Sequence, residues 1–165
     1  MSSNILATMF TFTTYGTWLR GDQRGWVQHG QVYSENPQLE ASDRARMKHA
    51  PFYFDEDQWF EIGDKIGTQL TQRSDVKILA MAIRSWHVHF LVSASCHEPG
   101  VIAKCAKDAV RYHLRPGRPI WTTGYDKRYC FDEQTVFNRV RYIERHNTEL
   151  DRPPRPWDFI TDWRM

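Results

Sequence analysis

Two histidines, His87 and His89, flank a single valine and offer the first recognisable chemistry in this sequence. Alternate residues of a β-strand point to the same face, so both imidazoles would leave one side of a sheet. Trp86, Val88 and Phe90 would then leave the other side. Because neutral imidazole is a ligand for several divalent metals, we interpret the pair as half of a metal site. The alternative is two half-buried histidines that are hydrogen-bonded to the backbone.

A second pair, Tyr142 and His146, lies four residues apart near the end of the chain. In a helix, side chains at this spacing are neighbours on one face. The periodicity places Val136, Val140 and Ile143 in one apolar stripe, and the pair on the opposite side of the helix. A hydroxyl would thus lie beside a possible third metal ligand. The alternative is a tyrosine that simply faces solvent.

Taken together, the two pairs predict a metal-assisted nucleophile. Three imidazoles could hold a divalent ion with open positions, and such an ion could bind a phosphate and orient it for attack. A free phenol is almost wholly protonated near pH 7, so Tyr142 would need the ion, or a nearby base or cation, to lose its proton. Tyr112 and Tyr129 are weaker candidates. Tyr112 has no ligand four residues on, and Tyr129 lies on an expected strand.

The elements that must position these residues follow from hydrophobic periodicity and turn residues. Their order is strand, long loop, helix, two strands, helix, strand, helix, and the short break between the two central strands favours an antiparallel hairpin. This pattern predicts an α+β, ferredoxin-like fold, an antiparallel sheet with helices on one face. Strands are expected over 5–15, 76–83, 86–93, 120–122 and 128–131, and helices over 37–48, 56–73, 101–115 and 132–147.

Helix caps and the domain organisation can be predicted as well. Asp55 is expected to cap the helix that begins at residue 56, with Gln58 as its capping-box partner, and Asp132 is expected to cap the last helix. We expect one domain over residues 1–150, with a long ordered loop at about 16–54. An extended tail should follow over 151–165, where prolines disfavour a helix.

Composition sets the broad class of the protein. The chain has 165 residues, 41% of them hydrophobic and 25% charged, which is typical of one compact globular domain. Its three cysteines form an odd set without a pattern, which indicates the reducing cytoplasm. No apolar run is long enough to cross a membrane. The net charge is only +2, but residues 101–165 hold 13 basic against 9 acidic side chains, so this part is the more suited to phosphates.

At these residues the sequence resembles the single-tyrosine HUH transposases, in particular the REP-associated tyrosine transposases and their IS200-like relatives. The resemblance covers most of the chain and follows the family's order. It is carried by HVHFLV at 87–92, by VRYIE at 140–144, by TTYGTWLRGD at 13–22 with RGWV at 24–27, and by WTTG at 121–124 with RY at 128–129.

The resemblance implies a metal-dependent endonuclease and strand transferase that acts on single-stranded DNA, built on the HUH endonuclease core. Tyr142 would attack the scissile phosphate and leave a 5′-phosphotyrosine and a free 3′-OH. His87, His89 and His146 would hold the ion. The resemblance also implies single-stranded DNA with a hairpin as partner, a homodimer, no association with membranes, and a cytoplasmic, nucleoid-associated location.

Two positions depart from the family pattern. Trp86 stands where the family often has Asn before its first histidine, and His146 stands where Gln or Asn is common. Mg²⁺ or Mn²⁺ is the expected cofactor, but three imidazoles are softer than two imidazoles and an amide oxygen. Mn²⁺, Co²⁺, Ni²⁺ or Zn²⁺ would therefore compete better against Mg²⁺. Asn147 is the alternative third ligand.

Basic and aromatic residues elsewhere are candidates for nucleic-acid binding. Cations can neutralise phosphates, and tryptophans of the long loop, with Tyr33, can stack on unpaired bases. A solvated helix face and a loop folded onto its own aromatic residues are the alternatives. The predicted nucleic-acid-binding residues are Trp18, Arg20, Arg24, Lys104, Lys107, Arg111, Arg115, Lys127 and Arg128.

Two other functions fit the same residues. One is a catalytically inactive or domesticated relative that binds structured single-stranded DNA or RNA. The other is an unrelated metallohydrolase that uses the same histidines with an activated water. The Tyr142→Phe substitution separates them from a tyrosine nuclease, because only a tyrosine nuclease loses a covalent adduct.

Overall fold

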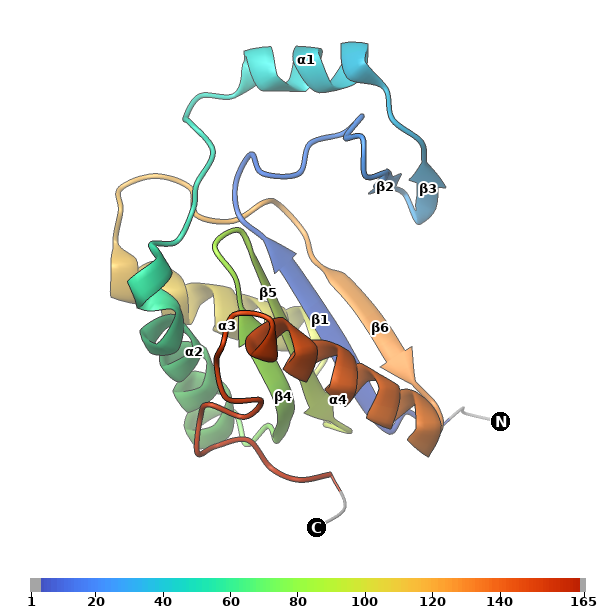
Figure 1. The fold of residues 1–165 in the computed structure, drawn as a ribbon, viewed down its shortest axis with the longest axis vertical. Coiled ribbons are helices and arrows are strands. Elements are labelled where there is room, and N and C mark those ends of the chain that lie inside the picture. Colours follow the sequence, from blue (N-terminus) through green and yellow to red (C-terminus); the bar gives the residue numbers. More distant parts are fainter. Residues whose placement is uncertain (1–3, 164–165) are drawn as a thin grey trace.

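A four-stranded antiparallel sheet forms the centre of the computed structural model, which describes residues 4–163 (Figure 1). The strand order is β4-β5-β1-β6. The central strand β1 (Ala7–Thr13) pairs with β5 (His87–Ser93) on one side and with β6 (Asp126–Cys130) on the other. The strand β4 (Ile78–Ile83) pairs with the outer side of β5. The predicted α+β class and the central hairpin are therefore confirmed.

Helices cover both faces of this sheet, so the prediction of helices on one face was wrong. The helices α2 (Trp59–Thr68) and α3 (Pro99–Leu114) pack on the face that carries Phe10 and Phe90. The helix α4 (Glu133–Thr148) covers the other face, over Met9 and Leu91. All six residues of β4 are buried, and a strand that is apolar on both sides needs cover on both sides.

The helix caps were predicted with mixed success. Asp132 caps α4 as expected, because its Oδ1 accepts a hydrogen bond from the backbone N–H of Thr135 at 2.7 Å. Asp55 occupies the N-cap position before residue 56, but within the described chain its side chain makes no capping hydrogen bond. The expected helix over 56–73 has three parts: a 3₁₀ turn (Glu56–Gln58), α2, and a π-helical turn (Gln69–Arg73).

The long segment over residues 16–54 lies beyond the end of the sheet where β1 ends and β5 begins (Figure 1). It contains α1 (Pro37–Arg46), close to the predicted 37–48, and an unpredicted hairpin of β2 (Trp26–Gln28) and β3 (Gln31–Tyr33). The hairpin turns at His29 and Gly30, both with positive φ. This conformation favours the two-residue turns that join antiparallel strands. The strand expected at 120–122 is reduced to one bridge, between Thr14 and Trp121.

The C-terminal segment from residue 151 packs back onto the domain. Trp157 is 3% exposed and lies against α2 at Gly63, where a Cβ atom would lie 2.1 Å from the indole. Further on, Ile160 forms a parallel bridge with Ile78 and covers the outer edge of β4. The last two residues of the predicted tail, and the first three of the predicted domain, lie outside the described residues.

Candidate metal centre and nucleophile

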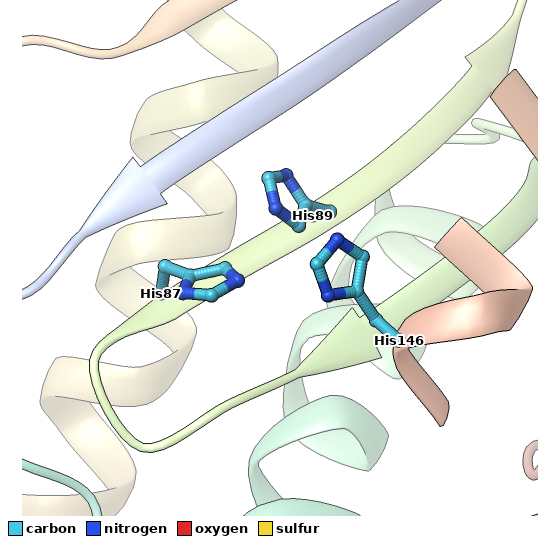
Figure 2. Close-up of side chains that lie close together, drawn as sticks. All are labelled: His87, His89 and His146. Atoms are coloured by element: carbon cyan, nitrogen blue, oxygen red, sulfur yellow. The ribbon is translucent and has the colours of Figure 1, made fainter. Parts of the chain in front are cut away.

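Three histidines converge on the sheet face that α4 covers (Figure 2). His87 and His89 extend from β5, and His146 extends toward them from the last turns of α4. Each histidine offers one ring nitrogen as a ligand, and these three nitrogens all lie within 4.8 Å of one another. The prediction that the two strand histidines share one face is therefore confirmed.

The environment of these imidazoles suits a bound cation. His87 and His89 are 7% and 6% exposed. Both ring nitrogens of His87 are buried without a hydrogen-bond partner among the described residues, whereas His89 Nδ1 shares a hydrogen bond of 2.8 Å with Thr11 Oγ1. A buried polar atom without a partner is costly, and a divalent ion coordinated by His87 would remove this cost. The three histidines therefore fit the divalent metal ion that the sequence analysis predicts.

Burial also sets the protonation state of the cluster. Burial first, and then the positive charge of neighbours such as Arg84, lower the pKa of His87 to about 3 and that of His89 to about 2. Burial lowers the pKa of His146 as well. All three rings are thus neutral at pH 7, and the neutral ring is the form that binds a metal.

Tyr142 lies beside the histidine cluster in the same chain. Its ring centroid is 5.5 Å from that of His89 and 4.9 Å from that of His146, and the side chain is 42% exposed. The cluster and a tyrosine that solvent can reach are therefore adjacent without a contribution from a second subunit.

The apolar stripe of α4 explains how this placement arises. Val136 and Ile143 are fully buried against the sheet. His146 is half-buried at the flank of this stripe, so its predicted position on the opposite side of the helix was wrong. Tyr142 precedes His146 by one helical turn. The rings of both residues lie close to that of His89 on β5.

Asn147, the alternative third ligand, has a different position. It is completely buried, and its Nδ2 donates hydrogen bonds to the carbonyl oxygens of Met81 at 2.9 Å and Pro154 at 3.2 Å. The amide therefore ties the end of α4 to β4 and to the C-terminal segment. His146 is the residue of this pair that lies in the histidine cluster.

Arg84 and Thr11 contact the cluster, and no sequence pattern predicted either contact. Arg84, in the connection after β4, donates from Nη1 to His146 Nδ1 at 3.1 Å and to Glu149 Oε2 at 3.3 Å. Thr11 lies directly opposite His89 in the register of β1 and β5. Both contacts join residues more than 60 positions apart: the first depends on where α4 packs, and the second on the register of β1 and β5.

The long loop forms an aromatic and cationic layer next to His87. The rings of Trp86 and His87 are 4.1 Å apart, and Trp18 lies 5.6 Å from Trp86. The guanidinium of Arg24 lies over both indoles, 4.0 Å from Trp18 and 4.9 Å from Trp86. Arg24 also forms an ion pair of 2.6 Å with Asp22.

The other aromatic and basic residues of this loop pair with each other. Arg20 forms an ion pair of 2.6 Å with Asp43. Trp26 stacks on Tyr33, with ring centroids 4.5 Å apart. These contacts match the alternative in which the loop folds onto its own aromatic residues.

The predicted basic residues of α3 do not gather at the histidines, because α3 packs on the other face of the sheet. Lys104 and Arg111 both pair with Asp108. Lys107 donates hydrogen bonds to the carbonyl oxygens of Thr122 and Gly124, and Arg115 Nε donates to that of Tyr112. On β6, Lys127 lies over the ring of Tyr129, and Arg128 pairs with Asp126.

No protein-family model and no curated protein matches the chain. Among solved structures, the chain is similar to a REP-associated tyrosine transposase bound to a REP hairpin, with a TM-score of 0.53 and 11% identity over 96% of this chain and 78% of that one. The two chains share a fold. A protein of Deinococcus radiodurans, provisionally described as a transposase, has a TM-score of 0.44 and 16% identity over 87% of this chain and 92% of that one. The fold shared with the first of these structures agrees with the α+β fold that the sequence predicts.

Proposed function

We propose that this protein is a transposase that cuts and rejoins single-stranded DNA through Tyr142, with a divalent metal as cofactor. The observation that carries the proposal is the position of the Tyr142 ring beside a buried cluster of three neutral histidines. The fold that the chain shares with a REP-associated tyrosine transposase supports the same function.

The proposed reaction is a transesterification at a DNA phosphate. His87, His89 and His146 would hold the ion, which would bind the phosphate and withdraw charge from it. Tyr142 gives up its phenolic proton, and its oxygen bonds to phosphorus while the bond from phosphorus to the 3′-oxygen breaks. The 3′-oxygen takes a proton and leaves as a 3′-OH, and the 5′-phosphate stays on the tyrosine. Attack by another 3′-OH reverses these steps and joins two strands without ATP.

The donor set bears on the metal. Three imidazoles suit Mn²⁺, Co²⁺, Ni²⁺ and Zn²⁺ better than Mg²⁺, which prefers oxygen ligands. We propose Mg²⁺ or Mn²⁺ as the cofactor. Of these two ions, Mn²⁺ is favoured by the imidazole ligands.

The proposed DNA partner is a single strand that contains a hairpin, as in the transposase structure with the similar fold. Tyr142 is open to solvent, so a flexible strand can reach it. Among the described residues, no helix is long and apolar enough to cross a membrane. A homodimer and a cytoplasmic, nucleoid-associated location stay predictions, and all four side chains of the candidate site come from one chain.

A covalent-adduct assay tests the proposal. A randomised pool of labelled, hairpin-containing single-stranded oligonucleotides is incubated with the protein and Mn²⁺, then denatured and separated by size. We expect a labelled protein band that EDTA prevents and that Tyr142→Phe abolishes while DNA binding is retained. Tyr129→Phe, on β6, is the matched control and should keep the band.

The two other functions would give different results in the same assay. An inactive binder would shift the labelled DNA in a native gel and give no adduct with any metal. A hydrolase that uses an activated water would cut the DNA without an adduct and would keep cutting after Tyr142→Phe.

A further inference from the structure

The contact between Arg84 and His146 has a consequence for the candidate metal site. A guanidinium carries five N–H donors and no acceptor, so in the 3.1 Å contact Arg84 must donate and His146 Nδ1 must accept. A neutral imidazole has one bare nitrogen and one protonated nitrogen. The neutral ring therefore carries its proton on Nε2 while this hydrogen bond is present.

In that state His146 has no lone pair left for a metal. The lone pair of Nδ1 points to Arg84, and Nε2 is protonated. The ring can bind an ion through Nε2 only after its proton has moved to Nδ1, and a protonated Nδ1 cannot accept from a guanidinium. The hydrogen bond from Arg84 and coordination by His146 through Nε2 thus exclude each other.

A second partner for Nδ1 lies close by. Glu149 follows His146 by three residues at the end of α4, so the two side chains are neighbours on the helix surface. Glu149 Oε2 lies 3.3 Å from the same Arg84 nitrogen that contacts His146. A metal-bound histidine usually donates its other N–H to a carboxylate, a carbonyl or a water, and this carboxylate is available for that role.

We propose that Arg84 and Glu149 are opposing positioning residues for the third metal ligand. Arg84 holds His146 in a form that cannot bind a metal, and Glu149 accepts the Nδ1 proton in the form that can. Because a guanidinium also repels a divalent cation, Arg84 disfavours the loaded site by its charge as well as by its hydrogen bond. This inference rests on the metal site of the proposed function.

Titration with Mn²⁺ alone, followed by electron paramagnetic resonance of the free ion, tests both residues. We expect Arg84→Met to bind Mn²⁺ about fivefold more tightly than the wild type, the equivalent of one lost hydrogen bond. Arg84→Lys keeps the charge and a donor and should stay near the wild type. Glu149→Gln should bind about tenfold more weakly. Arg73→Met, at an exposed position on the other side of the sheet, is the matched control and should not change the affinity.

Failure of this inference differs from failure of the proposed function. If the wild type binds Mn²⁺ and His87→Ala does not, the metal site stands, and equal or weaker binding by Arg84→Met overturns the role of Arg84 alone. Equal binding by Glu149→Gln overturns the role of Glu149. If the wild type does not bind Mn²⁺, the metal site of the proposed function fails.

A measurement on the metal-free wild type tests the starting state without any variant. Long-range proton–nitrogen NMR spectra of histidine side chains distinguish a ring protonated on Nε2 from one protonated on Nδ1. We expect His146 to be protonated on Nε2 near pH 7. A ring protonated on Nδ1 would overturn the inference, even if the Arg84 variants did not fold.

Discussion

Among the described residues, His87 is the one whose two side-chain nitrogens are both buried without a hydrogen-bond partner. These nitrogens lie among two further imidazoles. A bound ion is one of the physical explanations for such a buried group without a partner. The metal site therefore makes predictions at the level of single residues.

Metal binding should stabilise the folded protein. An ion that binds only the folded state stabilises it by about 2.7 kcal/mol when its concentration is one hundred times Kd. We expect Mn²⁺ or Zn²⁺ to raise the melting temperature, EDTA to reverse the rise, and His87→Ala to abolish it. The matched control is His113→Ala, because His113 lies on α3 and pairs with Glu61. A thermal shift that persists in His87→Ala would place the metal elsewhere.

The metal-free protein should lose stability as the pH falls from 7 to 5. The pKa of His87 is lowered to about 3 in the folded state, against 6.5 for the unperturbed group, so below pH 6.5 the unfolded chain binds the extra proton. At pH 5 this difference costs about 2 kcal/mol for a fully depressed histidine. Urea denaturation in EDTA at both pH values measures it. In His87→Gln, the free energy of unfolding should fall less between pH 7 and pH 5 than in the wild type. An equal fall in both proteins would contradict the prediction.

At the scale of elements, the position of α4 depends on how the helix is tied to its neighbours. Val136 and Ile143 pack on the sheet, and Asn147 bonds to Met81 and Pro154. The C-terminal segment in turn packs on α2, where glycines leave room for aromatic rings. The segment therefore helps to hold the helix that carries Tyr142.

A methyl group at Gly63 should disturb this packing. A Cβ atom there would lie 2.1 Å from the indole of Trp157, so Gly63→Ala must displace a buried ring. We expect a loss of about 1–3 kcal/mol in the free energy of unfolding, typical of an overpacked core. Gly100→Ala is the matched control, because Gly100 is also helical and its nearest atom would lie at 3.7 Å. Chemical denaturation of both variants measures the effect, and equal stabilities would show that the segment adapts.

The sequence predicted those elements whose signals are local. Apolar runs indicated the hairpin strands β4 and β5, and Asp132 indicated the start of α4. The hairpin of β2 and β3 was missed because its strands have only three residues each. The covering of both sheet faces was missed because periodicity shows which side of a helix is apolar but not which face of the sheet it meets.

The candidate site was predictable to the same extent. Strand periodicity paired His87 with His89, and helix spacing paired Tyr142 with His146. We combined the two pairs into one site on their chemistry, and the resemblance to a known family supported this. The sheet face that α4 covers, on which their meeting depends, was not predicted. The contacts of Arg84 and Thr11 depend on chain segments far apart in sequence, so no local pattern could have indicated them.

For the whole molecule, the distribution of charge over the two faces bears on where DNA lies. Lys104 and Arg111 pair with Asp108 on α3, on the sheet face opposite α4. Arg141 and Arg145 are exposed on α4, the helix that also carries Tyr142. A strand that reaches the tyrosine therefore passes α4 before it can pass α3.

The two faces should contribute unequally to binding of a short strand. We expect the Arg141→Gln, Arg145→Gln double variant to bind a 12-nucleotide single strand more weakly, with a salt slope reduced by about 0.7 for each lost phosphate contact. The Lys104→Gln, Arg111→Gln double variant is matched in charge and should change the affinity less. Fluorescence anisotropy between 50 and 200 mM salt measures both, and a larger loss in the α3 variant would place the strand on the other face.

Identification of the residue that becomes attached to DNA tests the central claim most directly. The denatured protein–DNA adduct is digested with protease and nuclease, and the modified peptide is sequenced by mass spectrometry. We predict a nucleotide linked through its 5′-phosphate to Tyr142, formed only when a divalent metal is present. A nucleotide on Tyr112 or Tyr129, or cleaved DNA with no modified peptide, would contradict a tyrosine nucleophile at the histidine cluster.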